Sequence, residues 1–266
     1  MPAPLLPQWS TIHQPVIGML HLLPLPGAPG YGGSIAAVRE AMLRCAEALA
    51  SGGVDALMLE NFGDVPFYPG SVPAHVVAQM TALACEVRRR FDLPLGVNML
   101  RNDGRSALAV AHAAGAQFIR VNVLCGARVA DQGLIQGIAH DLLRDRSMLS
   151  ADVRILADVD VKHSAPLAPR PLAEEVADTI ERGLADALIV SGSGTGRPTD
   201  PSHLATAKAA AGHVPVFVGS GADAASVRDF ARADGFIVGS AFKAQGDVRH
   251  PVEVERVRRF MATLRG

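Results

Sequence analysis

The chain has 266 residues, of which 49% are hydrophobic, 19% charged and 5% aromatic, and its formal net charge is -1. This balance produces no field that would favour nucleic acid or an acidic membrane, so we expect neither as a partner, and any anion site must be local. The length suits one large domain over residues 1–266, with residues 1–15 as an N-terminal extension. An aliphatic composition of this kind is typical of parallel strands that are buried on both faces.

The cysteines and the first residues of the chain indicate its compartment. Cys45, Cys85 and Cys125 are scattered and show no CxxC spacing, which argues against a disulfide framework and against a zinc site. The start of the chain lacks a basic segment followed by an apolar run, and no segment reaches the length of a membrane span. We therefore expect a soluble, cytoplasmic chain that is not cleaved.

In chain order, eight short apolar runs alternate with longer helical patterns. The predicted strands are 16–21, 54–60, 95–99, 118–123, 155–160, 187–191, 214–218 and 235–238. The predicted helices are 34–51, 74–91, 105–114, 134–147, 172–184, 202–211, 224–233 and 252–264. Alternation of this kind predicts an α/β fold with a parallel sheet. Eight units favour a single (β/α)8 TIM barrel over a doubly wound sheet, which would show GxGxxG after its first strand.

The longest predicted loops follow the first, second, fourth and fifth strands. They cover residues 22–33, 61–73, 124–133 and 161–171. All of them start at the carboxyl ends of strands, which is the face where barrel enzymes carry their catalytic residues.

Polar side chains end the first five strands. His21 ends the first, Glu60 the second, Asn98 lies near the end of the third, and Arg120 and Asn122 lie in the fourth. A carboxylate that ends an apolar strand is difficult to leave unsolvated, so Glu60 is a candidate site residue. A lone histidine such as His21 is equally compatible with a core position satisfied by a backbone carbonyl.

The fifth strand carries Asp158, Asp160 and Lys162 at intervals of two residues. This spacing places the three side chains on one face of a strand. Charged groups there are costly unless they face a polar cavity or pair with one another, so we interpret them as a functional cluster. The alternative is a structural ion pair that ties this strand to its neighbours. Asp103 is better explained as the cap of the following helix.

Gly/Ser-rich turns follow the last three strands. Amide N–H groups at helix N-termini bind anions, and glycine allows phosphate oxygens to approach the backbone closely. The turns therefore predict a phosphate site. Its candidate residues are Ser191, Gly192, Thr195, Gly219, Ser220, Gly221, Gly239 and Ser240. Lys243 either adds a positive charge there or is a solvated helix lysine.

Several runs together resemble one protein family. They are GMLHLLPLPGAPGYGG, DALMLENFGDVPF, GVNMLRNDGRSAL, FIRVNVLCGARVADQGLIQG, DVDVKHSAPL, LIVSGSGTG, FVGSGA and GFIVGSAFK. Between residues 16 and 243 the chain is similar to the BtpA family, which is named for a photosystem I biogenesis factor and includes SgcQ-like bacterial proteins of sugar-associated operons. The resemblance implies an eight-stranded barrel of the ribulose-phosphate-binding type with a phosphate grip at the last two strands. It implies no particular reaction.

We expect an enzyme of the lyase or isomerase type that acts on a phosphorylated sugar or nucleotide-like metabolite. Lys162 is the candidate reacting group, as a general base or a Schiff-base amine. Flanking carboxylates favour its protonated form, which suits an acid or an electrostatic stabiliser better than a free nucleophile. The other candidate catalytic residues are Glu60, Asp158 and Asp160 as acid/base partners, Asn98 and Asn122 to orient hydroxyl groups, and His21.

Cofactors and partners follow from the same residues. No cofactor or metal is expected, although Glu60, Asp158 and Asp160 are hard oxygen donors that suit Mg²⁺, and the nearby Lys162 disfavours it. The partner is a phosphorylated small molecule, and the chain could form a homo-oligomer, although no residue pattern identifies such a face. The alternative function is a non-catalytic assembly factor that retains the phosphate pocket.

Overall fold

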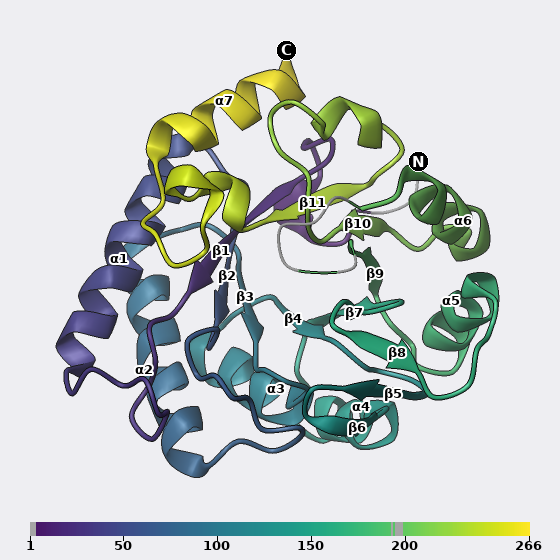
Figure 1. Cartoon of the computed structure of the whole chain (residues 1–266), viewed down its shortest axis with the longest axis horizontal. Helices are drawn as coiled ribbons and strands as arrows, with labels where there is room; N and C mark the ends of the chain where they lie inside the picture. Colours follow the sequence, from purple (N-terminus) through teal and green to yellow (C-terminus); the bar gives the residue numbers. More distant parts are fainter. Residues whose placement is uncertain (1–3, 193, 195–198) are drawn as a thin grey trace.

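The centre of the molecule is a closed barrel of eight parallel strands in the order β1-β11-β10-β9-β7-β4-β3-β2 (Figure 1). This computed structural model describes residues 4–192, 194 and 199–266. The strands are β1 (Val16–His21), β2 (Ala56–Glu60), β3 (Leu95–Asn98), β4 (Phe118–Val121), β7 (Arg154–Asp158), β9 (Ala187–Val190), β10 (Val216–Val218) and β11 (Gly235–Val238). Each lies where the sequence predicts it, with ends that differ by one or two residues at most. The predicted TIM barrel is confirmed.

Helices form a ring around the barrel (Figure 1). They are α1 (Ile35–Gly52), α2 (Ala74–Arg90), α3 (Gly104–Ala114), α4 (Ala139–Met148), α5 (Leu172–Glu181), α6 (Pro201–Ala211) and α7 (Val254–Arg265). The side chain of Asp103 accepts a hydrogen bond from Ser106 N at 3.0 Å, so it caps α3 as predicted. Contact between α7 and α1 closes the ring. Within the described part of the chain, no helix combines the length and apolar character needed to cross a bilayer.

One predicted helix is largely wrong. Residues 224–233 contain only a short 3-10 helix, η2 (Val227–Phe230). Asp223 Oδ1 accepts hydrogen bonds from the backbone N–H groups of Ala225 and Ser226, both at 2.9 Å. A side chain that binds the following amides in this way stabilises a turn in place of a regular helix.

A small antiparallel sheet lies beside the barrel and was not predicted. It contains β5 (Ala127–Ala130), β6 (Gly133–Gln136) and β8 (Ser164–Pro166) in the order β6-β5-β8 (Figure 1). The sequence predicts loops over 124–133 and 161–171 and a helix over 134–147, so the first part of that helix is wrong. The strands β5 and β6 are joined by two residues, and Gly133 has a φ of 93°, which glycine adopts readily.

The interior of the barrel is a separate apolar cluster that includes the N-terminal extension. The ring of Trp9, in the 3-10 helix η1 (Pro7–Trp9), lies 6.0 Å from that of Phe118 and 6.1 Å from that of Phe217. Its Nε1 donates a 3.3 Å hydrogen bond to the carbonyl of Asp55, just before β2. Trp9 therefore fills the amino-terminal end of the barrel. The cluster is formed by Leu6, Trp9, Ile17, Met19, Ala56, Met58, Phe118, Leu156, Ala187, Ile189, Phe217 and Ile237.

We expect Trp9→Ala to lower the free energy of unfolding by about 3–5 kcal/mol, because it leaves a cavity at the end of the barrel core. Chemical denaturation followed by circular dichroism measures this change. The matched control is Met148→Ala, since Met148 is 75% exposed and its loss should change stability by about 0.5 kcal/mol or less. Equal effects of the two substitutions would contradict the role given to Trp9.

Candidate active site

A row of polar residues crosses four neighbouring strands at the carboxyl end of the barrel. His21 of β1 lies opposite Glu60 of β2, Glu60 lies opposite Asn98 of β3, and Asn98 lies opposite Arg120 of β4. The strand register therefore places these side chains at one level. Below them the barrel interior is apolar, so the polar layer marks the mouth.

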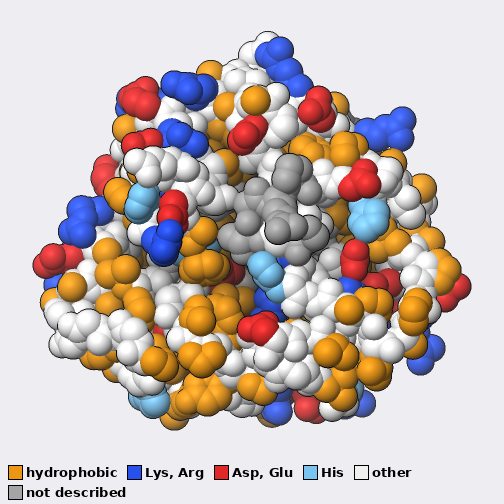
Figure 2. Space-filling model, in the orientation of Figure 1, with side chains coloured by type: hydrophobic (Ala, Val, Ile, Leu, Met, Phe, Trp, Pro, Cys, Tyr) orange, Lys and Arg blue, Asp and Glu red, His pale blue; other side chains and the backbone are white. Residues whose placement is uncertain are grey.

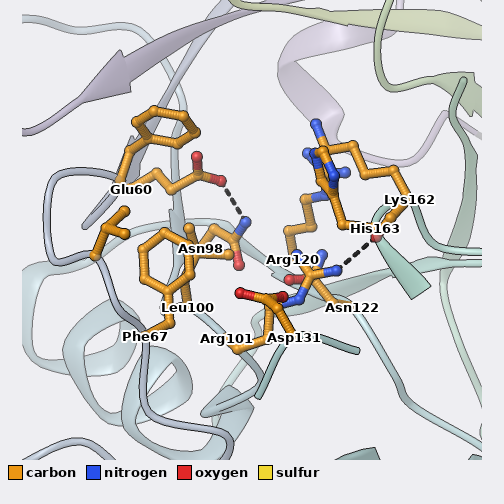
Figure 3. Close-up of a pocket in the computed structure, with 12 residues that line it drawn as sticks. Glu60, Phe67, Asn98, Leu100, Arg101, Arg120, Asn122, Asp131, Lys162 and His163 are labelled. Carbon is orange, nitrogen blue, oxygen red and sulfur yellow. Dashed lines mark hydrogen bonds between the residues drawn. The ribbon is translucent and has the colours of Figure 1, made fainter. Parts of the chain in front are cut away.

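The mouth contains a cavity of about 460 Å³ (Figure 3). This volume falls in the range of small-molecule sites. Charged and histidine side chains gather near the centre of this face of the molecule (Figure 2). The lining residues are Glu60, Phe62, Val65, Phe67, Asn98, Leu100, Arg101, Arg120, Asn122, Asp131, Lys162 and His163.

A buried ion pair joins β4 to β7. The Arg120 guanidinium donates to Asp158 through Nε at 2.8 Å and Nη2 at 2.7 Å. Asn122 Nδ2 donates to the same carboxylate at 2.7 Å. All three side chains are buried. Because its oxygens are occupied by these donors, Asp158 holds Arg120 and Asn122 in place, and its predicted part in proton transfer has no free oxygen to support it.

The prediction that Asp158, Asp160 and Lys162 share one face is wrong. Strand β7 ends at Asp158, and Asp160 has a φ of 49°, so the chain turns between them. The Asp160 carboxylate accepts a 2.6 Å hydrogen bond from Arg128 Nη2, and its side chain is 44% exposed. Arg128 is buried and also contacts Glu175 at 3.3 Å. Asp160 thus belongs to an ion-pair cluster beside β5 and does not line the central cavity.

Lys162 lies at the mouth, as predicted, but its charge is disfavoured. Burial lowers the pKa of its amine to about 8, and the nearby Arg120 acts in the same direction. Glu60 and Asp158 offset this effect only in part. The expectation that flanking carboxylates favour the protonated amine is therefore wrong in its net direction. The Lys162 carbonyl accepts a 2.6 Å hydrogen bond from Arg101 Nη2, which fixes the backbone there (Figure 3).

Glu60 is oriented by its neighbours in the polar row. Asn98 Nδ2 donates a 2.5 Å hydrogen bond to Glu60 Oε2 (Figure 3). His21 Nε2 lies 3.5 Å from Glu60 Oε1. Burial, with the positive charges of Lys243, Lys162 and Arg120, lowers the pKa of His21 well below its ordinary value. His21 is therefore a neutral imidazole, and its contact with Glu60 is not an ion pair.

Four buried polar atoms near the mouth have no hydrogen-bond partner among the described residues. They are His21 Nδ1, Arg101 Nε, Asn122 Oδ1 and Ser191 Oγ. Buried polar atoms in folded proteins are usually bonded to protein or to water. Arg101 and Asn122 line the large cavity at the mouth, and His21 lines a smaller cavity beside it, so open donors and acceptors are available there to a polar ligand.

A second, small cavity of about 40 Å³ lies against the turns after β10 and β11. Its walls include Gly219, Ser220 and Gly221 from the first turn and Gly239 and Ser240 from the second. His21, Arg120 and Lys162 are among the other residues that line it. The predicted turn residues are thus brought together beside the polar row.

Close packing also requires glycine in these turns. A Cβ at Gly239 would lie 2.7 Å from the His21 ring, and one at Gly219 would lie 2.8 Å from Ser191 Oγ. Gly221 has a φ of 76°. Only short 3-10 helices follow the turns, η2 and η3 (Ser240–Phe242), so the expected α-helix N-termini are absent from this part of the described chain.

The turn after β9 joins this region through two hydrogen bonds. Gly192 N donates to Ser220 Oγ at 3.0 Å, and Thr199 Oγ1 donates to the Ser220 carbonyl at 2.8 Å. Ser191, which is buried, lies against Gly219. These contacts bring Ser191 and Gly192 to the predicted phosphate turns. Thr195 lies outside the described residues.

The carboxylates suggested for Mg²⁺ do not come together. Asp158 is bound by Arg120, Asp160 by Arg128, and Glu60 by Asn98. Over residues 4–192, 194 and 199–266 no group of three or more His, Cys, Asp or Glu side chains is arranged to hold a metal ion. The donor set of Glu60, Asp158 and Asp160 therefore does not fit this ion.

Three buried residues at or beside the site received no firm role from the sequence. Arg101 and Arg120 lie in or after apolar strands, a position where a buried charge implies a partner or a ligand. Lys243 is only 2% exposed, so its interpretation as a solvated lysine is wrong. Its position directly after a buried phenylalanine, Phe242, was a signal of burial.

Comparisons with known proteins agree with the architecture. The chain is 48% identical over 253 residues to the Photosystem I biogenesis protein BtpA of Synechocystis sp., covering 95% of this chain and 88% of that protein. An N-(5'-phosphoribosyl)anthranilate isomerase from Pyrococcus furiosus has a similar structure, with a TM-score of 0.58, 14% identity, and coverage of 95% of this chain and 99% of that one. KGPDC from Streptococcus mutans gives a TM-score of 0.59, 12% identity, and coverage of 95% and 98%.

The BtpA family model matches residues 12–266, and the chain belongs to that family. The resemblance found in the sequence motifs is confirmed. The two solved structures share the fold, and their low identity supports no conclusion beyond it.

We expect Asp158→Ala and Asp160→Ala to differ strongly in stability, although the sequence places both in one motif. Asp158→Ala leaves the buried Arg120 charge unpaired and should cost about 3–5 kcal/mol. Asp160→Ala removes a half-exposed partner of Arg128 and should cost about 1 kcal/mol or less. Chemical denaturation of both variants measures the difference. If Asp158→Ala unfolds the chain, the double variant Arg120→Met with Asp158→Leu should restore folding, because it removes both charges. A double variant that also fails to fold would contradict the pairing.

We expect Lys162 to titrate about two pH units below an ordinary lysine, with a pKa of about 8. The chain has three lysines, Lys162, Lys208 and Lys243. Lysine labelled with ¹³C at Cε therefore gives three NMR signals, which single Lys→Met variants assign. A Lys162 midpoint at the ordinary lysine value, about pH 10.4, would show that its amine is not desolvated.

Proposed function

We propose that this protein is an enzyme of the isomerase or lyase type that acts on a phosphorylated sugar or nucleotide-like metabolite. The observation that supports this most directly is the pairing of two cavities at the mouth. A cavity of about 460 Å³ contains Lys162, Glu60 and Asn98, and a cavity of about 40 Å³ adjoins it at the glycine turns. Glu60, Phe62, Arg120 and Lys162 line both.

The small cavity is the proposed phosphate site. The turns after β10 and β11 form its walls, and two cationic side chains, Arg120 and Lys162, line it. Gly219 N already donates to the Val190 carbonyl, so the proposed amide donors are those of the residues that follow it and of the turn after β11. Arg120 is already balanced by Asp158, so the charge free to attract an anion comes from Lys162, with Arg101 near by. Backbone amides and fixed cations are the usual partners of phosphate oxygens. The body of the metabolite would then extend into the large cavity.

Lys162 is the proposed reacting group. With a pKa of about 8, roughly one molecule in ten carries the neutral amine at pH 7. That form can remove a proton as a general base or attack a carbonyl carbon to form a Schiff base. An aldose–ketose type isomerisation needs a general base to remove a proton. Carbon–carbon cleavage beside a carbonyl is assisted by a Schiff base.

The remaining residues act around the amine. Glu60 is the proposed proton donor or acceptor, because Asn98 occupies one of its oxygens and leaves the other near the neutral His21 ring. Asn122 Oδ1 is open and is suited to accept a hydrogen bond from a substrate hydroxyl. Asp158 is a positioning residue that holds Arg120 and Asn122. Asp160 has no role in the proposed reaction, because it does not line the central cavity.

The fold is consistent with this proposal. Barrels of this architecture carry their chemistry at the carboxyl ends of the strands, where the mouth lies. One structural neighbour is named as an isomerase of a phosphoribosyl compound. That name describes the neighbour, and it suggests a phosphorylated pentose as the first probe for this protein.

The alternative is a non-catalytic biogenesis factor that retains the phosphate pocket. The observation in its favour is the name of the Synechocystis relative, which is 48% identical. Against it stands Lys162, because a desolvated amine with a lowered pKa is costly to maintain without a use.

We expect Lys162→Arg to abolish turnover while binding persists. Arginine retains a positive charge but neither releases its proton near neutral pH nor forms a Schiff base, so turnover should fall by about 10²–10⁴-fold. ³¹P NMR of a mixture of sugar phosphates identifies the metabolite that the unaltered protein converts, and calorimetry with ribose 5-phosphate measures binding. Lys208→Arg is the control, since Lys208 pairs with Asp234 away from the mouth.

Two outcomes would contradict the proposal. Turnover that persists in Lys162→Arg would remove the lysine from the chemistry. If the unaltered protein converts no sugar phosphate, and the Lys162→Arg variant keeps full activity in cells, the biogenesis factor is favoured instead.

A further inference from the structure

A third cavity, of about 820 Å³, lies beside the mouth and shares His21, Phe62 and Val65 with the cavities of the proposed catalytic site. It is enclosed by α1, by the loops after β1 and β2, and by the segment between β11 and α7, which runs beside α1 in Figure 1. We call it the side pocket. Its lining residues include Leu22, Cys45, Phe62, Lys243 and Val252.

The side pocket contains a buried amine whose charge is not balanced. Lys243 is 2% exposed, and its Nζ has the Cys45 thiol, at 3.8 Å, as its polar side-chain partner. Over the described residues no carboxylate lies within ion-pair distance of it, in contrast to Lys208. Burial lowers the pKa of Lys243, and the neighbouring Cys45 only partly opposes this. A buried ammonium without an anion is costly.

The two arginine side chains of the side pocket are, unlike Lys243, mostly exposed to solvent, and each has a carboxylate neighbour. Arg44 lies 4.0 Å from Glu40, and Arg249 is held by Asp247 through several contacts. No Asp or Glu side chain lines the pocket within the described part of the chain. Of the lysine and arginine side chains that line it there, Lys243 is therefore the one that lacks a carboxylate partner. His21, whose Nδ1 is buried and has no partner among the described residues, also lines the pocket.

We propose that the side pocket binds an apolar monocarboxylic acid, with its carboxylate on Lys243 and its apolar body against Leu22, Phe62 and Val252. One unbalanced positive charge matches one negative charge, which favours a carboxylate over a phosphate dianion. The volume suits a small molecule of one or two rings or an equivalent chain. Because Phe62 and Val65 also line the central cavity, the bound acid lies directly behind the wall of the catalytic site.

Calorimetry with 2-naphthoate and 2-naphthamide tests this proposal, since the two compounds share shape and differ in charge. We expect naphthoate to bind the unaltered protein at least about tenfold more tightly than the amide, because of the charge-assisted contact with Lys243. In Lys243→Met this preference should disappear. Lys208→Met is the matched control and should retain it.

Two further measurements locate the ligand. Naphthoate should shift the ¹³Cε NMR signal of Lys243, which is one of three lysines in the chain, and saturating inorganic phosphate should leave its affinity unchanged. Displacement by phosphate would place the acid in the central site and overturn the proposal. Equal binding of acid and amide, or a preference that survives in Lys243→Met, would also overturn it. Loss of turnover in Lys162→Arg has no bearing on these outcomes, so the side pocket and the proposed reaction fail independently.

Discussion

The buried ion pair between Arg120 and Asp158 determines the electrostatics of the mouth. Its two short hydrogen bonds fix the guanidinium against the wall of the barrel, and Asn122 is held by the same carboxylate. Asp158 and Glu60 only partly offset the effect of burial on the pKa of Lys162, and the guanidinium itself disfavours a second positive charge. Burial and the neighbouring Arg120 guanidinium together lower the pKa of Lys162, so a structural ion pair contributes to the protonation state of the amine at the mouth.

The sequence is sufficient to predict the barrel because its strands are apolar on both faces and are separated from the helices by recognisable turns. It is also sufficient to place His21, Glu60 and Asn98 at the mouth, since each ends a strand and parallel strands present their ends together. It fails at Asp160, because the rule that alternate residues share a face applies only while the strand continues. The left-handed conformation of Asp160 ends that regularity, and the residue type gives weak warning of it.

The small sheet shows a second limit of local patterns. Residues 134–147 have the apolar spacing of a helix, yet Gly133–Gln136 pairs with β5, and β5 pairs in turn with the distant β8. Arg128 on β5 joins this sheet to Asp160 and Glu175. Contacts between segments far apart in the chain decide the structure there. Such contacts are not encoded in the periodicity of any one segment, so the loops around the mouth were less predictable than the barrel beneath them.

The glycines of the last two strands illustrate how one residue can satisfy two constraints. At Gly239 a side chain would strike His21, and at Gly219 it would strike Ser191, so packing alone explains why glycine is required. The same close approach brings the backbone of these turns beside the polar row, where the adjoining cavity has a volume of about 40 Å³. A phosphate group is small and binds well to exposed amides, whereas the rest of a metabolite needs the larger space above Glu60 and Lys162. Under the proposed function, tight packing at these turns would place the phosphate at one end of the site, and Lys162 would lie between the two cavities because it lines both.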